Sequence, residues 1–295
     1  MLNKTKYNVT IVMLLVIIGL VSALSTGFGS FNTTPVLPPD EQNQDGGGEM
    51  PTDGFTAPSR DASPLARLEF AFGALKTGAG FWAEAESVVL SMGVEQKVFN
   101  TYYRTGKEDI TLEWQYSASN LAKNEFWAKY SNETEVVAKK TTSKSDFSYA
   151  DKSFDGAKLN LYKTYSKNEY TSNFKALNDY PISMSKDTLN FTKHDKTSDA
   201  NNYIITATVN VAKIDQEYIN QFTENGTEGV NFTSMKLTFK INKKTGFLSS
   251  IMREESFKTK YSGISVNCEA TMIMRFKAVN KSMKTEIDAI KAKAF

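Results

Sequence analysis

Residues 110–116 read ITLEWQY, and apolar and polar side chains alternate at every position of this stretch. Its apolar members are Ile110, Leu112, Trp114 and Tyr116. Successive side chains of a β-strand point to opposite faces, so this alternation predicts a half-buried strand. The stretch therefore favours a fold built on sheets, and the flanking sequence shows of which kind.

Runs of the same type occur on both sides of this stretch. They cover residues 82–92, 96–104, 125–130, 188–193, 203–211, 233–241, 247–255 and 265–277. Turn residues separate several of them, as in TGK at 105–107 and NKKTG at 242–246. Because only antiparallel neighbours can be joined by such short turns, the sequence predicts an antiparallel meander.

Helical patterns interrupt the strands at three places. A leading helix follows Ser63-Pro64 and ends near Gly78, with Leu65, Leu68, Phe72 and Leu75 on one face. A second begins with a capping box, Ser166 to Glu169, and is expected to end before Pro181. In the third, apolar residues recur at every fourth position: Ile214, Tyr218 and Phe222.

This order of elements resembles the LolA/LppX-like lipid-binding fold. The segment MKLTFKI at 235–241, its turn at 242–246 and the strands at 247–257 and 264–276 also resemble uncharacterised exported proteins of Gram-positive bacteria. The resemblance covers residues 65–280 and implies an α+β fold, mainly antiparallel β. It implies an open half-barrel meander with an N-terminal helix and one or two helices covering the concave face. Those relatives are often lipoproteins, whereas this chain lacks the lipid-acceptor cysteine.

A half-barrel of this kind presents apolar residues on its concave face, where they pack helices or hold an acyl chain. The residues expected on a ligand-binding wall are Ile110, Leu112, Trp114, Tyr116, Trp127 and Met272. The same residues would also serve as plain core, so both interpretations stay open.

The N-terminus carries an export signal. Lys4 and Lys6 precede the apolar segment 9–24, and no basic residue follows until Arg60. The positive-inside rule then leaves the N-terminus in the cytoplasm and sends the rest across the membrane. Residues 1–28 are either a signal peptide cleaved after Ala23 or a single retained membrane anchor.

Three further regions complete the expected organisation. Residues 29–63 are rich in Pro, Gly and acidic side chains and predict a flexible linker. Residues 64–280 would form the β-rich extracytoplasmic domain, either anchored to the cell membrane or secreted. Residues 281–295 would form a basic C-terminal tail.

Composition and single residues exclude several classes. The net charge is +2, from 35 basic and 33 acidic residues, without the basic stripe of a nucleic-acid-binding protein. The single cysteine, Cys268, cannot form a disulfide within the chain. It falls on the same strand face as the apolar residues Val266 and Ala270, which predicts a buried core residue. The single histidine, His194, is expected in an exposed turn.

The sequence contains no nucleophile elbow, phosphate loop or His-Glu-x-x-His motif, so we expect neither an enzyme nor a cofactor. Two function classes remain. One is an extracytoplasmic binding protein for a lipid or other apolar small molecule, associated with the membrane through its N-terminal segment. The other is a stalked cell-surface interaction or structural domain with no small ligand.

Overall fold

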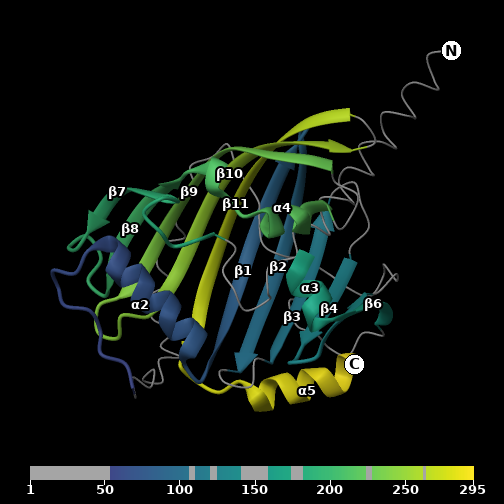
Figure 1. Ribbon diagram of the computed structural model, residues 1–295, viewed down its shortest axis with the longest axis horizontal. Coiled ribbons are helices and arrows are strands. Elements are labelled where there is room, and N and C mark those ends of the chain that lie inside the picture. Colours follow the sequence, from purple (N-terminus) through teal and green to yellow (C-terminus); the bar gives the residue numbers. More distant parts are fainter. Residues whose placement is uncertain are drawn as a thin grey trace.

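The computed structural model describes residues 54–105, 110–119, 125–140, 159–173, 182–223, 228–261 and 264–295. Within these ranges, eleven antiparallel strands form one sheet in the order β6-β5-β4-β3-β2-β1-β11-β10-β9-β8-β7 (Figure 1). Because the two edge strands β6 and β7 do not pair with each other, the sheet stays open. The predicted α+β, mainly antiparallel half-barrel is confirmed.

The sheet consists of two meanders that meet in its centre. The first wing contains β1 (Gly80–Ser91), β2 (Val94–Thr105), β3 (Thr111–Ser119), β4 (Glu125–Ser131), β5 (Glu135–Lys140) and β6 (Asn160–Ser166). The second wing contains β7 (Leu189–Asp195), β8 (Asn202–Val209), β9 (Glu228–Asn242), β10 (Leu248–Tyr261) and β11 (Ile264–Val279). The chain thus starts at the centre with β1, reaches one edge, crosses to the other and returns to pair β11 with β1.

The three helices that the sequence predicts are present. Helix α2 (Pro64–Thr77) is capped by Ser63, whose side chain accepts a hydrogen bond from the Ala66 amide. Helix α3 (Lys167–Asn173) begins after Ser166, whose hydroxyl accepts from the Glu169 amide at 3.1 Å. A 3₁₀ turn, η2 (Val211–Lys213), precedes α4 (Gln216–Thr223). The continuation of α3 expected up to residue 180 lies largely outside the described residues.

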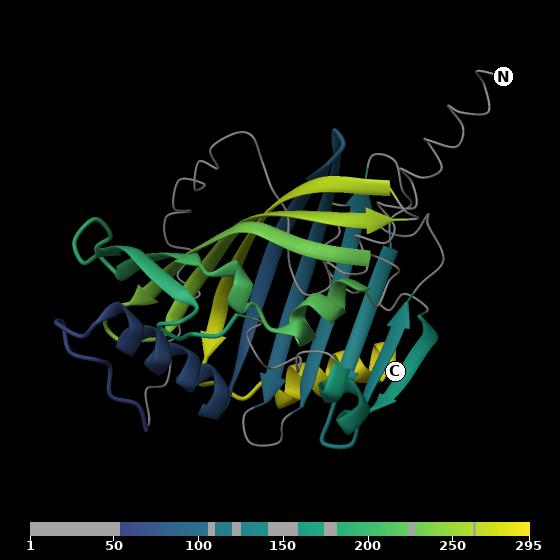
Figure 2. The ribbon, with the colours of Figure 1, turned by 45° about the horizontal axis from the view of Figure 1, so that its top comes forward.

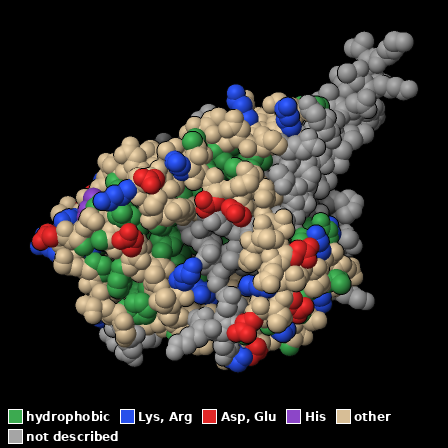
Figure 3. Space-filling view, viewed as in Figure 1, with side chains coloured by type: hydrophobic (Ala, Val, Ile, Leu, Met, Phe, Trp, Pro, Cys, Tyr) green, Lys and Arg blue, Asp and Glu red, His purple; other side chains and the backbone are tan. Residues whose placement is uncertain are grey.

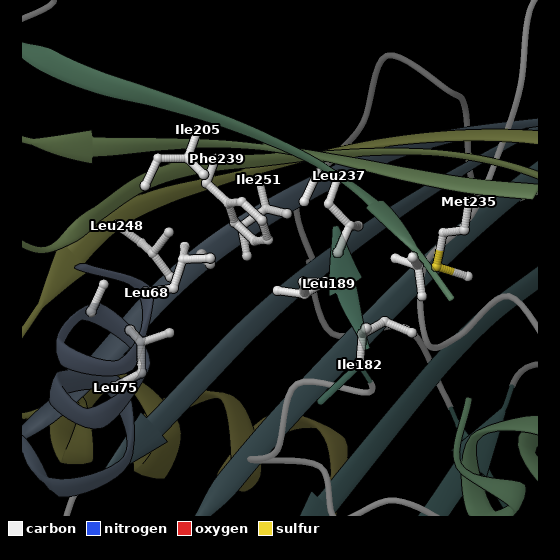
Figure 4. Packing of buried hydrophobic residues seen from close by; sticks show 14 of the residues in the cluster. Leu68, Leu75, Ile182, Leu189, Ile205, Met235, Leu237, Phe239, Leu248 and Ile251 are labelled. Atoms are coloured by element: carbon white, nitrogen blue, oxygen red, sulfur yellow. The ribbon is translucent and has the colours of Figure 1, made fainter. Parts of the chain in front are cut away.

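The sheet curves around α2 and α4, so the face that carries these helices is its inner face (Figure 2). The largest apolar cluster lies between α2 and the second wing on this face, and Figure 4 shows it from close by. Leu68 and Leu75 of α2 belong to this cluster, together with Leu237, Phe239 and Ile251 of the sheet. Hydrophobic side chains also gather around α2 on the surface seen in Figure 3.

The apolar face changes sides between the two wings. In the first wing, Leu112, Phe126 and Tyr130 belong to a second cluster on the opposite, outer face. Helix α5 (Lys284–Ala294) covers this cluster with Ile287 and Ala294. The register places Leu112 and Tyr130 opposite each other and out of phase with the inner-face residues of the same strands.

Two expected boundaries change. Residues 281–295 are not a tail beyond the domain, because α5 packs on the sheet and Met283 and Ile287 are each 1% exposed. The end of the expected linker also packs: the ring of Phe55 lies edge-on to Phe70 at 6.0 Å and to Phe247 at 5.6 Å. The folded unit therefore includes residue 55 at one end and α5 at the other.

None of the described helices is long and apolar enough to cross a membrane. The apolar segment 9–24, the rest of residues 1–28 and linker residues 29–53 lie outside the described residues, so the predicted anchor or signal peptide stays a prediction.

Candidate functional site

A pair of charged residues lies in the middle of the inner face. Arg253 and Glu255 of β10 follow Ile251 and precede Phe257 in the same strand phase, and all four are buried. In the register, Arg253 lies between Leu237 of β9 and Met272 of β11. Two charges therefore interrupt an otherwise apolar row of side chains.

The two charged groups face each other at longer than hydrogen-bond distance. Arg253 Nε lies 3.7 Å from Glu255 Oε2, and both side chains are 0% exposed. Burial raises the pKa of the Glu255 carboxyl well above its ordinary value, and the neighbouring Arg253 guanidinium opposes this rise. The ion pair therefore only partly offsets the loss of water around the carboxyl group.

Both Glu255 carboxyl oxygens are buried and accept no hydrogen bond. A buried polar group without a partner costs about 1–3 kcal/mol, and more when it is charged. Most buried polar atoms in native proteins are satisfied, so such an exception calls for a physical explanation. Glu255 is thus an acceptor on the inner face with unused capacity.

Helix α4 covers this part of the inner face. Tyr218 is 0% exposed, and its ring centroid lies 5.7 Å from Arg253 Cζ. The same ring stacks on Phe232 of β9 at 5.7 Å, which fixes the helix against the sheet. An aromatic face next to a guanidinium is a favourable arrangement, so Tyr218 helps to hold Arg253 beneath α4.

Small side chains occupy the inner face of β1, which lies two strands from this pair with β11 between them. The inner-face positions of β1 between residues 83 and 91 are Ala83, Ala85, Ser87, Val89 and Ser91, all buried. The hydroxyl of Ser87 and the Nε2 atom of Gln96, on β2, are buried without a hydrogen-bond partner. Gln96 and Glu255 share one row across the sheet, with Val89 and Ala270 between them. Polar groups thus flank a central strip of small residues.

Cys268 lies at the end of this strip and is 1% exposed, as the sequence predicts. Its Sγ atom lies 3.5 Å from the Ser91 hydroxyl. Burial raises the pKa of the thiol to about 11. The hydrogen bond with Ser91 lowers this pKa, and the nearby Glu255 raises it, but both effects are smaller than that of burial. Because the thiolate is the nucleophile, this cysteine is a core residue and not a reactive thiol.

The residues predicted to line one wall do not share one face. Met272 and Trp127 lie on the inner face and are 1% and 5% exposed. Leu112 and Ile110 instead pack in the outer cluster with α5, so the expectation that they face the concave side is wrong. Trp114 and Tyr116 pair with Thr101 and Phe99 of β2, but their side chains lie outside the described residues.

This difference has a simple physical origin. Period-2 alternation shows which residues of a strand share a face, but not which face of the sheet that is. The outer face of the first wing is apolar because α5 covers it, and α5 lies in the segment expected to be a tail. The sequence therefore grouped Ile110 and Leu112 correctly and assigned them to the wrong side.

Trp127 belongs to a separate aromatic group on the first wing. Its ring meets Tyr162 of β6 edge-on at 4.9 Å. The Nζ atom of Lys140 lies 4.8 Å from the Trp127 ring and 4.5 Å from the Tyr162 ring. Trp127 thus contacts Tyr162 and Lys140. It lies on β4, and strands β3, β2 and β1 separate it from Met272 on β11.

His194 is half-buried rather than exposed. Its ring lies 6.3 Å from that of Tyr203, and burial lowers its pKa with help from Arg67 and Lys196. No group of three or more His, Cys, Asp or Glu residues that could hold a metal ion occurs among the described residues.

The sequence reasoning did not single out Arg253 and Glu255. A signal was present, because residues 251, 253, 255 and 257 share one strand phase and two of them are charged. Charged residues in phase with Ile251 and Phe257 occupy the buried side of a half-buried strand. The residues next to them on neighbouring strands could not be predicted from the sequence, because the register between strands is set by the tertiary structure.

No protein-family model matches this chain, and no curated protein matches it. One solved structure that does match is a mutant of the vaccine antigen Transferrin Binding Protein B from Haemophilus parasuis Hp5. The match has 10% identity and a TM-score of 0.15, and it covers 70% of this chain but only 28% of that chain. This chain therefore spans less than a third of that structure, and so low a score supports no argument about fold or function.

Proposed function

We propose that the protein is a non-enzymatic, extracytoplasmic binding protein for a lipid or other apolar ligand. The observation that carries the proposal is the inner face of an open sheet where Glu255, fully buried, has unused acceptor capacity beside a strip of small residues. Plain core packing is dense and leaves few polar atoms unsatisfied.

The side chains around the strip suit a ligand of variable shape. Met235, Met272 and Met274 lie on the inner face around Arg253 and Glu255. Methionine is unbranched and polarizable, so it adapts to irregular apolar partners. These residues support an apolar ligand more than a small polar substrate.

The location outside the cytoplasm is inferred from the N-terminal sequence. Lys4 and Lys6 lie before the apolar segment 9–24, which orients the remaining chain to the far side of the membrane. Both a retained anchor and a released form agree with this proposal, since either delivers residues 54–295 to the same side.

Native mass spectrometry of the full-length protein purified from its host tests the proposal. We expect co-purified apolar molecules that organic extraction removes. The variant Ala85→Leu adds bulk to the inner-face strip, whereas Glu86→Leu adds the same side chain at an exposed position on the opposite face. Ala85→Leu should lose most of the bound material and Glu86→Leu should retain it. A wild-type protein free of apolar ligand would overturn the proposal.

A surface interaction domain is the second candidate, and the edge strand β6 favours it. Leu161 and Tyr162 of β6 are 63% and 41% exposed. Apolar side chains on an edge strand are typical of surfaces that pair with another chain. This function would gain support if Leu161→Glu abolished binding to a partner while the purified protein carried no apolar molecule.

A further inference from the structure

The chemistry of the proposed ligand follows from the surroundings of Glu255. Its carboxyl group is fully buried, both oxygens lack a hydrogen bond, and Arg253 Nε is 3.7 Å away. The neighbours across the sheet are Ala270 on one side and Met235 on the other. Neither of these two neighbours offers a side-chain donor to the Glu255 carboxyl group.

The charge of the site selects among polar groups. Burial favours the neutral form of the Glu255 carboxyl group, and Arg253 carries the positive charge of the pair. An ammonium group would lose its hydration next to this charge, and a further buried ion of either sign is costly unless it is well paired. A hydroxyl group is neutral and donates a hydrogen bond, so it can satisfy a carboxyl oxygen at lower cost.

A second polar position lies in line with the first. Gln96 Nε2 is buried without an acceptor, and it shares a row of the sheet with Glu255. Three strand spacings separate the two positions, about 14 Å. Between them lie the small side chain of Ala270 and that of Val89, and beside them lies Ser87 with its unpartnered hydroxyl. Donor and acceptor groups therefore border an apolar strip.

We propose that Glu255 accepts hydrogen bonds from the hydroxyl groups of an uncharged amphiphile whose acyl chain lies along the small inner-face residues of β1. This inference rests on the proposed function and adds the ligand's class: a neutral lipid with a polyol head. Gln96 lies about 14 Å from Glu255, beyond the reach of the same head group, and Met272 borders the chain.

The test compares three ligands with similar acyl chains against the full-length protein, by competition in native mass spectrometry. Monooleoylglycerol carries two hydroxyl groups, methyl oleate carries none, and oleate carries a negative charge. We expect monooleoylglycerol to bind roughly tenfold more tightly than methyl oleate, as one or two net hydrogen bonds imply. Glu255→Gln should abolish most of that preference and change methyl oleate binding by less than about twofold.

Two further variants guard against misfolding and indirect effects. The double variant Arg253→Met/Glu255→Leu replaces the pair with apolar side chains, a change that often preserves or increases stability. It should bind methyl oleate and monooleoylglycerol equally. Glu254→Gln, in the adjacent position on the outer face, should retain the wild-type preference.

The outcomes separate this inference from the proposed function. Failure of all three ligands to bind would overturn both. Equal binding of methyl oleate and monooleoylglycerol by the wild type, or an unchanged preference in the double variant, would overturn the role of Glu255 and leave apolar binding intact. Tightest binding of oleate would overturn the preference for a neutral head.

Discussion

Three buried arginines illustrate how single residues place charge inside this sheet. Arg67 of α2 donates to the carbonyl oxygens of Ser59 and Arg60 at 2.8 and 2.6 Å and lies 3.6 Å above the Tyr203 ring. Arg104 donates to the last carbonyls of α2. Arg253 lies beside the carboxyl group of Glu255. The first two tie chain segments together, whereas the third holds a charge on the proposed ligand-binding face.

The stability of the protein should depend on pH through Glu255. Its folded-state pKa is raised above the ordinary value of 4.5 by burial, so above that pH the unfolded state releases this proton more readily. The folded state then binds more protons, and the contribution of Glu255 to stability is present at low pH and falls as pH rises. Urea unfolding at a series of pH values above 4.5 should show this fall, and Glu255→Gln should lack it.

Glu254→Gln is the matched control, because Glu254 lies in the next position of the same strand and on the opposite face. Its pH profile should follow that of the wild type. Parallel profiles for the wild type and Glu255→Gln would contradict the raised pKa of Glu255.

At the scale of elements, the ends of α2 are fixed by residues from other parts of the chain. Ser63 caps its N-terminus, and Arg104 of β2 donates to the carbonyl oxygens of Leu75 and Lys76 at its C-terminus. The Asn280 side chain accepts from the Ala79 amide at 2.9 Å just beyond the helix. A cation near the carbonyl end of a helix also interacts favourably with the helix dipole. The C-terminal end of α2 is therefore tied to β2 and to the residue that follows β11.

Replacing Arg104 should loosen this end of α2. Arg104→Met keeps the apolar stem and removes both hydrogen bonds to the helix carbonyls, so we expect a loss of about 2–4 kcal/mol in unfolding free energy. Arg104→Lys retains the charge but not the forked geometry, and its loss should be intermediate. Denaturant unfolding measures both. Equal stability of Arg104→Met and the wild type would show that these hydrogen bonds contribute nothing net.

At the scale of the whole molecule, the two wings are joined by the pairing of the first strand with the last. Strand β1 pairs with β11 from Phe81 to Ser91, and each also pairs with a strand of its own wing. The contacts that unite the sheet are therefore far apart in sequence. Such pairings form late and require most of the chain to be in place.

Amide hydrogen exchange should follow this arrangement. The amides of β1, β10 and β11 lie in the centre of the sheet and should exchange most slowly, near the global unfolding limit. Those of β6 and β7 lie at its edges and should exchange fastest among the strands. Mass spectrometry of peptic fragments resolves these segments. Fast exchange in β11 would contradict its role as the joint between the wings.

The sequence by itself determined the local structure of this protein. Alternation identified nine of the eleven strands that the described residues form, and the capping residues Ser63 and Ser166 marked where α2 and α3 begin. The turn at 242–246 was also predicted from its residues. The structure shows why a glycine suits this turn: Gly246 has φ 73°, and a side chain there would collide with Phe70. These features depend on neighbours in sequence, where steric and hydrogen-bonding preferences act directly.

Only the tertiary structure decided which face each strand presents and which polar groups meet. Leu112 faces α5 and Met272 faces the inner side because the apolar surface changes sides between the wings, and no single strand contains that information. The short strand β5 and the mostly exposed strand β6 lacked a clear pattern. Glu255 became a candidate anchor only when the register placed it between Met235 of β9 and Ala270 of β11, because burial is a property of the assembled sheet.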